Sequence, residues 1–131
     1  MICNSFKSFN KVIHECSFKY SEIDKLYLTG SQVEFFKKET LSKDSDIDLI
    51  VFFSTNTMSP GIIPFFSKVT TQLNIIIHPL LIFENEKKIK LGINEYRSAI
   101  QNGILLYSKN NYELGAGVAG LSQTSWVNNY K

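Results

Sequence analysis

The segment LYLTGSQVEFFKKETLSKDSDIDLIVFF, residues Leu26 to Phe53, contains two apolar runs that are typical of strands, with polar chain between them. Gly30 and Ser31 follow the first run, and Asp46 and Asp48 stand at the start of the second. If the two runs form neighbouring strands, the Gly-Ser pair and the aspartate pair can meet at the sheet's edge. This juxtaposition decides what we predict for both the fold and the site.

The composition is that of a single globular domain. The chain has 131 residues, of which 44% are hydrophobic and 13% aromatic, and this argues against disorder. The formal net charge of +2 is too small to predict nucleic-acid binding, so nucleic acid is not expected as a direct partner. Arg97 is the only arginine, so recognition of a polyphosphate would depend on lysines, backbone N–H groups or a metal.

The termini and cysteines indicate the compartment. The N-terminus lacks the apolar core of a leader, and no run approaches the roughly 18 apolar residues of a membrane span. We therefore expect a cytoplasmic protein without a membrane partner. Cys3 and Cys16 could form a disulfide, but we favour two idle or buried thiols.

The spacing of apolar residues predicts a small α/β (α+β) fold. Helical periodicity is present at 5–20, 64–72 and 83–101. Strand-like runs are present at 26–29, 48–53, 73–78 and 104–107. The run at 48–53 is apolar throughout and predicts a central strand, whereas 32–43 suits a loop with a helical turn. We expect a mixed sheet with helices mainly against one face, and Pro79 at the end of the third strand.

The last part of the chain differs in character from the rest. Residues 1–108 form the predicted domain, and 109–131 contain three glycines and Trp126 without periodicity. We interpret this tail as either mobile or docked, on a partner or on the domain itself.

The two aspartates suggest a metal site. Residues i and i+2 of a strand point to the same face, so Asp46 and Asp48 would present two carboxylates side by side. Such like charges are unfavourable together unless a cation lies between them, and Mg²⁺ prefers oxygen ligands. The alternative is that both simply face water at a turn.

Gly30 and Ser31 suit a phosphate group. Glycine permits close backbone approach, and Ser31 offers a hydroxyl and an N–H group to an anion. A small residue beside phosphate and a metal-holding acid pair is the arrangement that phosphoryl or nucleotidyl transfer requires.

These residues carry a resemblance to a known family. The segments TGSQV and SKDSDIDLIVFF resemble the signature of the minimal nucleotidyltransferases of the polymerase-β-like superfamily, which is Gly-Ser followed by D-x-D leading a strand. The segment QLNIIIHPLLIFENE stands where those proteins have a third strand with one more aspartate. The segment INEYRSAIQNGILLYSK is similar to their closing helix and final strand. The resemblance spans about residues 5–108.

The resemblance implies a role for each matching residue. Gly30 and Ser31 would hold the nucleoside triphosphate, for which ATP is expected, and Asp46 and Asp48 would hold one or two Mg²⁺ ions. The family's third acid helps to hold metal and accepts a proton from the acceptor hydroxyl, and its position aligns with Asn74. The product would be a nucleoside monophosphate joined to a hydroxyl of a protein or small molecule. Such proteins often pair with a helical HEPN-type partner, as the antitoxin of a toxin–antitoxin pair.

The chain also departs from the family pattern. Residues 32–35 differ from the small or basic residues and second glycine that follow Gly-Ser in the family, and the 16 positions between Gly30 and Asp46 make a longer loop than expected. Asn74 cannot carry negative charge or take a proton, although His78 could substitute as a base. Two interpretations stay open: an active nucleotidyltransferase, or a catalytically silent subunit that binds nucleotide or protein.

Overall fold

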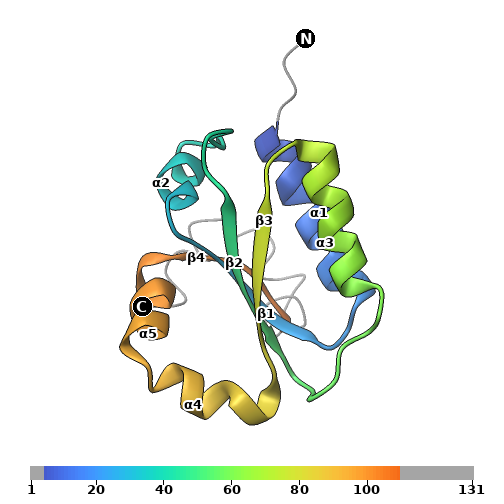
Figure 1. Cartoon of the computed structure of the whole chain (residues 1–131), viewed down its shortest axis with the longest axis vertical. Helices are drawn as coiled ribbons and strands as arrows, with labels where there is room; N and C mark the ends of the chain where they lie inside the picture. Colours follow the sequence, from blue (N-terminus) through green and yellow to red (C-terminus); the bar gives the residue numbers. More distant parts are fainter. Residues whose placement is uncertain (1–4, 110–131) are drawn as a thin grey trace, which may run out of the picture.

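The centre of the fold is a mixed four-stranded sheet (Figure 1). The computed structural model describes residues 5–109. The strands are β1 (Ile23–Thr29), β2 (Ile47–Phe53), β3 (Ile77–Ile82) and β4 (Ile104–Ser108), in the order β3-β2-β1-β4. β1 runs antiparallel to β2 and β4, and β2 runs parallel to β3. The apolar run at 48–53 is therefore a central strand, as predicted.

Helices cover both faces of this sheet. They are α1 (Ser5–Lys19), α2 (Gln32–Lys37), α3 (Ile62–Leu73), α4 (Lys87–Leu91) and α5 (Asn94–Asn102), with a 3₁₀ turn η1 (Glu84–Glu86). α1 and α3 lie together on one face, and α4 and α5 lie away from them (Figure 1). The expectation of helices mainly on one face is corrected in this respect, because β2 is apolar on both sides.

Two apolar clusters, one on each side of the sheet, hold these layers together. In the larger cluster, Phe9 of α1 and Phe66 of α3 pack with strand residues that include Val51. In the smaller cluster, Tyr27 and Phe52 belong to a group against which α4 and α5 pack. Successive residues of β2 thus point into the two clusters in turn. This alternation determines on which face of the sheet each residue before Ile50 lies.

The third strand lies further along the chain than predicted. α3 continues to Leu73, and Asn74 caps its end in the left-handed conformation with φ of 57°. The predicted strand at 73–78 is therefore wrong in its bounds, because β3 starts at Ile77 and includes Pro79. Proline is tolerated there because β3 is an outer strand that pairs only with β2.

The helix predicted at 83–101 is divided. α4 ends at Leu91 with Gly92 as its C-cap, and Ile93 has extended dihedral angles before α5 begins. Glycine is a poor helix former, so the chain turns at this point instead of continuing as one long helix. The segment 32–43, predicted as a loop with a helical turn, contains the short helix α2.

Some expectations fall outside residues 5–109. The tail at 110–131 and Cys3 are among the residues that the structure does not describe. Cys16 is a free cysteine with no exposed surface, and burial raises the pKa of its thiol to about 12. Within the described part of the chain, no helix combines the length and the apolar character that crossing a membrane requires.

Candidate active site

The Gly-Ser pair and the aspartate pair meet at one end of the sheet. Thr29, the last residue of β1, is opposite Asp48 of β2, and its hydroxyl lies 3.4 Å from the Asp48 carbonyl oxygen. Gly30 follows with φ of +78°, a conformation that suits glycine. A Cβ atom at this position would lie only 2.5 Å from Oδ2 of Asp48. Any other residue at position 30 would be strained at this φ and would displace the Asp48 carboxylate.

Asp46 and Asp48 lie on either side of a buried anchor. Ile47 is fully buried in the larger apolar cluster, and its N–H donates to the carbonyl of Ile76. Strand alternation turns the two aspartates to the opposite face, which is also the face of Ile50. The side chain of Asp46 is 48% exposed, so its carboxylate is open to solvent and to a ligand.

His78 is the residue that β3 places beside this pair. In the parallel register of β2 and β3, His78 is level with Asp48. Its Nε2 atom lies 2.8 Å from Oδ2 of Asp46. Asn74 caps α3 three residues before the strand begins, so the structure does not bring it onto β3. The role proposed for Asn74 stays a prediction.

The sequence predicts that the third strand starts at Leu73, which would put Asn74 on this strand beside the aspartates. The strand starts at Ile77 instead, and His78 is the residue level with Asp48. Asn74 itself carried the missing signal, since asparagine is one of the few residues that often adopt the left-handed conformation at helix ends. Interpreted in that way, Asn74 would have marked the end of a helix.

Gly30 and Ser31 also line a hollow of about 690 Å³ beside α5. No motif in the sequence indicates this second wall, which presents polar side chains from successive turns of α5. The residues that line the hollow are Gly30, Ser31, Val33, Glu34, Asn94, Glu95, Ser98, Ala99 and Asn102. None of these residues is basic, so charge on a bound phosphate would have to be compensated by other groups.

The acidic pair fits a magnesium ion by its chemistry. Within residues 5–109, no group of three or more His, Cys, Asp or Glu side chains is arranged to hold a metal. Mg²⁺ does not require such a group, because it commonly uses one or two carboxylates together with water and substrate phosphate. Asp46 and Asp48 could supply those carboxylates, and Gly30 has no side chain that would crowd Asp48.

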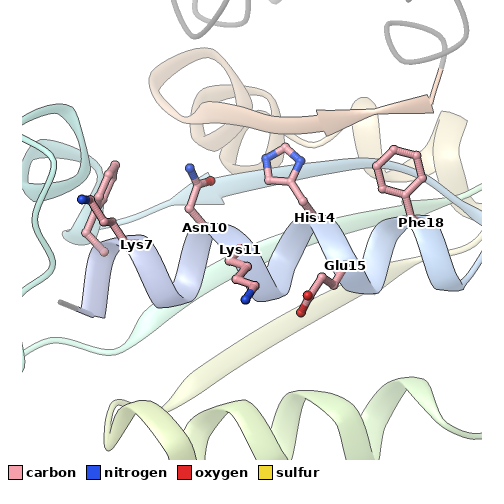
Figure 2. Close-up of a pocket in the computed structure, with 7 residues that line it drawn as sticks. Lys7, Asn10, Lys11, His14, Glu15 and Phe18 are labelled. Atoms are coloured by element: carbon pink, nitrogen blue, oxygen red, sulfur yellow. The ribbon is translucent and has the colours of Figure 1, made fainter. Parts of the chain in front are cut away.

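A separate groove runs along α1 and does not include these residues. Its volume is about 460 Å³, and it is lined by Phe6, Lys7, Asn10, Lys11, His14, Glu15 and Phe18. Figure 2 shows Asn10, His14 and Phe18 on one side of α1, with Lys11 and Glu15 on the other. Burial lowers the pKa of His14. None of the predicted site residues lines this groove.

Comparison with known proteins gives a family. The family described as "Nucleotidyltransferase domain" matches residues 9–101, which is more than half of the chain. No curated protein matches the sequence.

Solved structures resemble the fold. One is a toxin–antitoxin complex with AMP-PNP, with 14% identity, a TM-score of 0.53 and coverage of 88% of each chain. Another is a mutant of the toxin–antitoxin MntA-HpeT, with 13% identity, a TM-score of 0.53 and the same coverage. A third is a tri-AMPylated HEPN toxin from Shewanella oneidensis in complex with an MNT antitoxin. It has 12% identity and a TM-score of 0.47, and the match covers 92% of this chain and 84% of that one.

At these sequence identities the structural similarity supports only the fold, whereas the family match rests on the sequence itself. The matched residues include the Gly30-Ser31 turn and the Asp46–Asp48 strand start, which the structure brings together. The chain therefore belongs to the nucleotidyltransferase domain family.

Proposed function

We propose that the chain binds a nucleoside triphosphate with Mg²⁺ and transfers a nucleoside monophosphate to a hydroxyl group. The observation that carries this proposal is the contact between Gly30 and Asp48, which leaves no room for a Cβ atom. In the proposal, Gly30 and Ser31 bind the triphosphate, while Asp46 and Asp48 bind the metal. The phosphate half and the metal half of the site are then adjacent, as in-line transfer requires.

The hollow beside α5 is proposed to receive the nucleoside. Asn94, Ser98 and Asn102 offer amide and hydroxyl groups that can form hydrogen bonds with a sugar or base. Because the residues lining this hollow include no lysine or arginine, the metal would supply most of the compensation for phosphate charge. ATP is the nucleotide that we propose, in line with AMP-PNP in a structure of similar fold.

His78 is proposed to accept the proton of the acceptor hydroxyl. An ionised carboxylate only accepts hydrogen bonds, so Nε2 of His78 donates its hydrogen to Asp46. Nδ1 of the neutral ring is then the nitrogen that can accept a proton. His78 is 59% exposed, which leaves room for an acceptor to approach.

The acceptor is proposed to be a helical HEPN-type partner, which would make this chain the antitoxin of a toxin–antitoxin pair. This step is supported by the toxin–antitoxin complexes that share the fold. A small-molecule acceptor is the alternative within the same activity.

A second candidate is a silent subunit that binds nucleotide or protein without transferring a nucleotide. The observation that favours it is the identity of residue 78, because the pairing with β2 brings a histidine and not a third carboxylate beside Asp46 and Asp48. A silent subunit that binds nucleotide would use the same binding residues as the enzyme and differ from it only in turnover.

The first test separates these candidates. The chain is co-expressed with a candidate HEPN-type partner, purified, and incubated with α-³²P ATP and Mg²⁺. We expect label on the partner, and Asp46→Asn with Asp48→Asn should reduce labelling on the order of 100-fold or more, because the metal then lacks both carboxylates. Asp44→Asn is the matched control, since Asp44 is an exposed aspartate of the same loop, and it should label normally.

The outcomes point in different directions. Metal-dependent binding of ATP without transfer would favour the silent subunit. A wild-type chain with neither transfer nor metal-dependent binding of any nucleoside triphosphate would contradict the proposed function.

A further inference from the structure

Gln32 is a fully buried polar residue in the first turn of α2, directly after Gly30 and Ser31. Its side-chain amide reaches across to the loop that leads into Asp46. Nε2 donates to the carbonyl oxygens of Ser42 at 2.6 Å and Ser45 at 2.7 Å, and Oε1 accepts from the Ser42 N–H at 2.9 Å. Both amide hydrogens and the amide oxygen are therefore used.

These three bonds are the polar connection between this loop and the domain. Within residues 5–109, every hydrogen bond from residues 41–45 to another part of the chain involves Gln32. Leu41 adds apolar packing at the start of the loop, and the ladder of β2 takes over at Ile47. Gln32 thus supplies the hydrogen bonds that fix the residues directly before Asp46.

The length of the loop makes this connection necessary. After α2 ends at Lys37, residues 38–45 lead to Asp46 outside any helix or strand, and fixing such a segment costs conformational entropy. A buried amide with all its groups paired fixes such a segment, because breaking the contact would leave buried polar groups without partners.

We infer that Gln32 is a positioning residue that sets the place of the Asp46 carboxylate relative to the Gly30-Ser31 turn. This inference rests on the proposed function. Gln32 directly follows Ser31 of the phosphate half of the site, and its side chain bonds to Ser45, the residue before Asp46 of the metal half. The Gln32 side chain therefore links the two halves directly, in addition to the pairing of Thr29 with Asp48. Catalytic groups tolerate only about 1 Å of misplacement before rates fall steeply, so the separation of the two halves matters for turnover.

The test removes the hydrogen bonds and keeps the volume. Gln32→Met has a side chain of similar length without an amide, and Gln72→Met is the matched control because Gln72 is exposed on α3. The first measurement is hydrogen–deuterium exchange of residues 42–46 in nucleotide-free protein. We expect exchange in Gln32→Met to be at least tenfold faster there, with β2 and α3 unchanged, and no effect of Gln72→Met.

The second measurement concerns the site. Binding of Mg²⁺-ATP is followed by calorimetry and transfer by labelling, each on wild type and both variants. Gln32→Met should weaken binding and lower kcat by about tenfold or more each, because the misplaced carboxylate affects the ground state and the transition state. A purely structural role would lower the unfolding midpoint and leave both quantities unchanged in the folded fraction.

If Gln32→Met does not fold, Gln32→Glu takes its place in both measurements. The glutamate keeps the acceptor for Ser42 N–H but points an oxygen at two carbonyl oxygens when it is ionised. The protection of its loop, measured as exchange relative to wild type at the same pH, should rise as the pH falls and the carboxyl group regains a donor. A ratio to wild type that does not change with pH would overturn the inference.

Other outcomes are also decisive. Unchanged exchange at residues 42–46 in Gln32→Met overturns the inference while wild-type activity keeps the proposed function intact. Faster exchange with unchanged binding and kcat overturns the positioning role. A wild-type chain that binds no Mg²⁺-ATP overturns the proposed function itself, and the inference with it.

Discussion

Strand register brings His78 to the aspartates. β2 and β3 are parallel, and their pairing puts His78 level with Asp48 while its ring contacts Asp46. A carboxylate at this position would face the same space as the aspartate pair, because residues paired in register share a face. The identity of residue 78 is therefore expected to tune metal affinity more than that of residue 74.

The substitution His78→Asp tests this expectation. We expect Mn²⁺ or Mg²⁺ to bind about tenfold more tightly to His78→Asp than to wild type, since a third anionic oxygen joins the pair. Asn74→Asp should bind metal as wild type does, because its backbone belongs to the end of α3. Isothermal titration calorimetry measures both. Tighter binding in Asn74→Asp alone would contradict the register argument.

At the residue scale, the sequence predicts the meeting of Gly30 with Asp48 better than it predicts the place of His78. Gly30 and Asp48 could be brought together by reasoning because they flank two consecutive strands, and antiparallel neighbours place such ends side by side. His78 lies on β3, which follows α3 in the chain, so the residue of β2 that it faces depends on where α3 ends. Gln32 could not be found at all, since nothing local shows that a glutamine has partners ten and thirteen residues away.

At the scale of elements, the end of α3 decides where β3 begins. Asn74 adopts φ of 57°, and its N–H donates to the carbonyl of Thr70 in the last turn. A side chain with a Cβ atom is strained in this conformation, although asparagine tolerates it better than most residues. The cap thus allows the chain to turn from the helix into the strand.

This cap gives a prediction on stability. Asn74→Ala should lower the free energy of unfolding by about 1 kcal/mol, whereas Asn74→Gly should change it by less than about 0.5 kcal/mol, because glycine adopts positive φ without strain. Urea denaturation measures both variants. Gln72→Ala, in the exposed last turn of α3, serves as the control and should be close to neutral. Equal losses for alanine and glycine at position 74 would show that the side chain, not the backbone, matters.

The elements that could be predicted are those with a strong period. α1 was expected at 5–20 and spans Ser5–Lys19, because its apolar spacing is regular and nothing interrupts it. The segment 83–101 has the same spacing, yet Gly92 and Ile93 divide it. The break coincides with Gly92, a poor helix former, and the spacing of apolar residues does not include such propensities.

At the scale of the whole molecule, stability depends on residues beyond the matched family region. The match ends at residue 101, but all five residues of β4 are buried beside β1. Leu106 of β4 has no exposed surface and belongs to the larger apolar cluster. The last strand is therefore part of the core of the domain.

Truncation of one β4 side chain tests this statement. Leu106→Ala should reduce the free energy of unfolding by about 2–5 kcal/mol, since it removes apolar contacts and leaves a cavity. Ile89→Ala is the matched control, because Ile89 is 72% exposed on α4 and should change stability by no more than about 0.5 kcal/mol. Denaturant unfolding compares the two. A loss below about 1 kcal/mol for Leu106→Ala would show that β4 contributes little to the core.

Pro79 has a further consequence for how copies of the chain meet. β3 is an outer strand, and outer strands are the usual templates for aggregation, because their free backbone groups can pair with another molecule. Proline lacks the N–H that such intermolecular pairing needs, and edge strands accommodate it with that position toward solvent. The margin next to the aspartates is thereby protected from edge-to-edge polymerisation, so the protein can leave this end of its sheet open for ligands without inviting fibres.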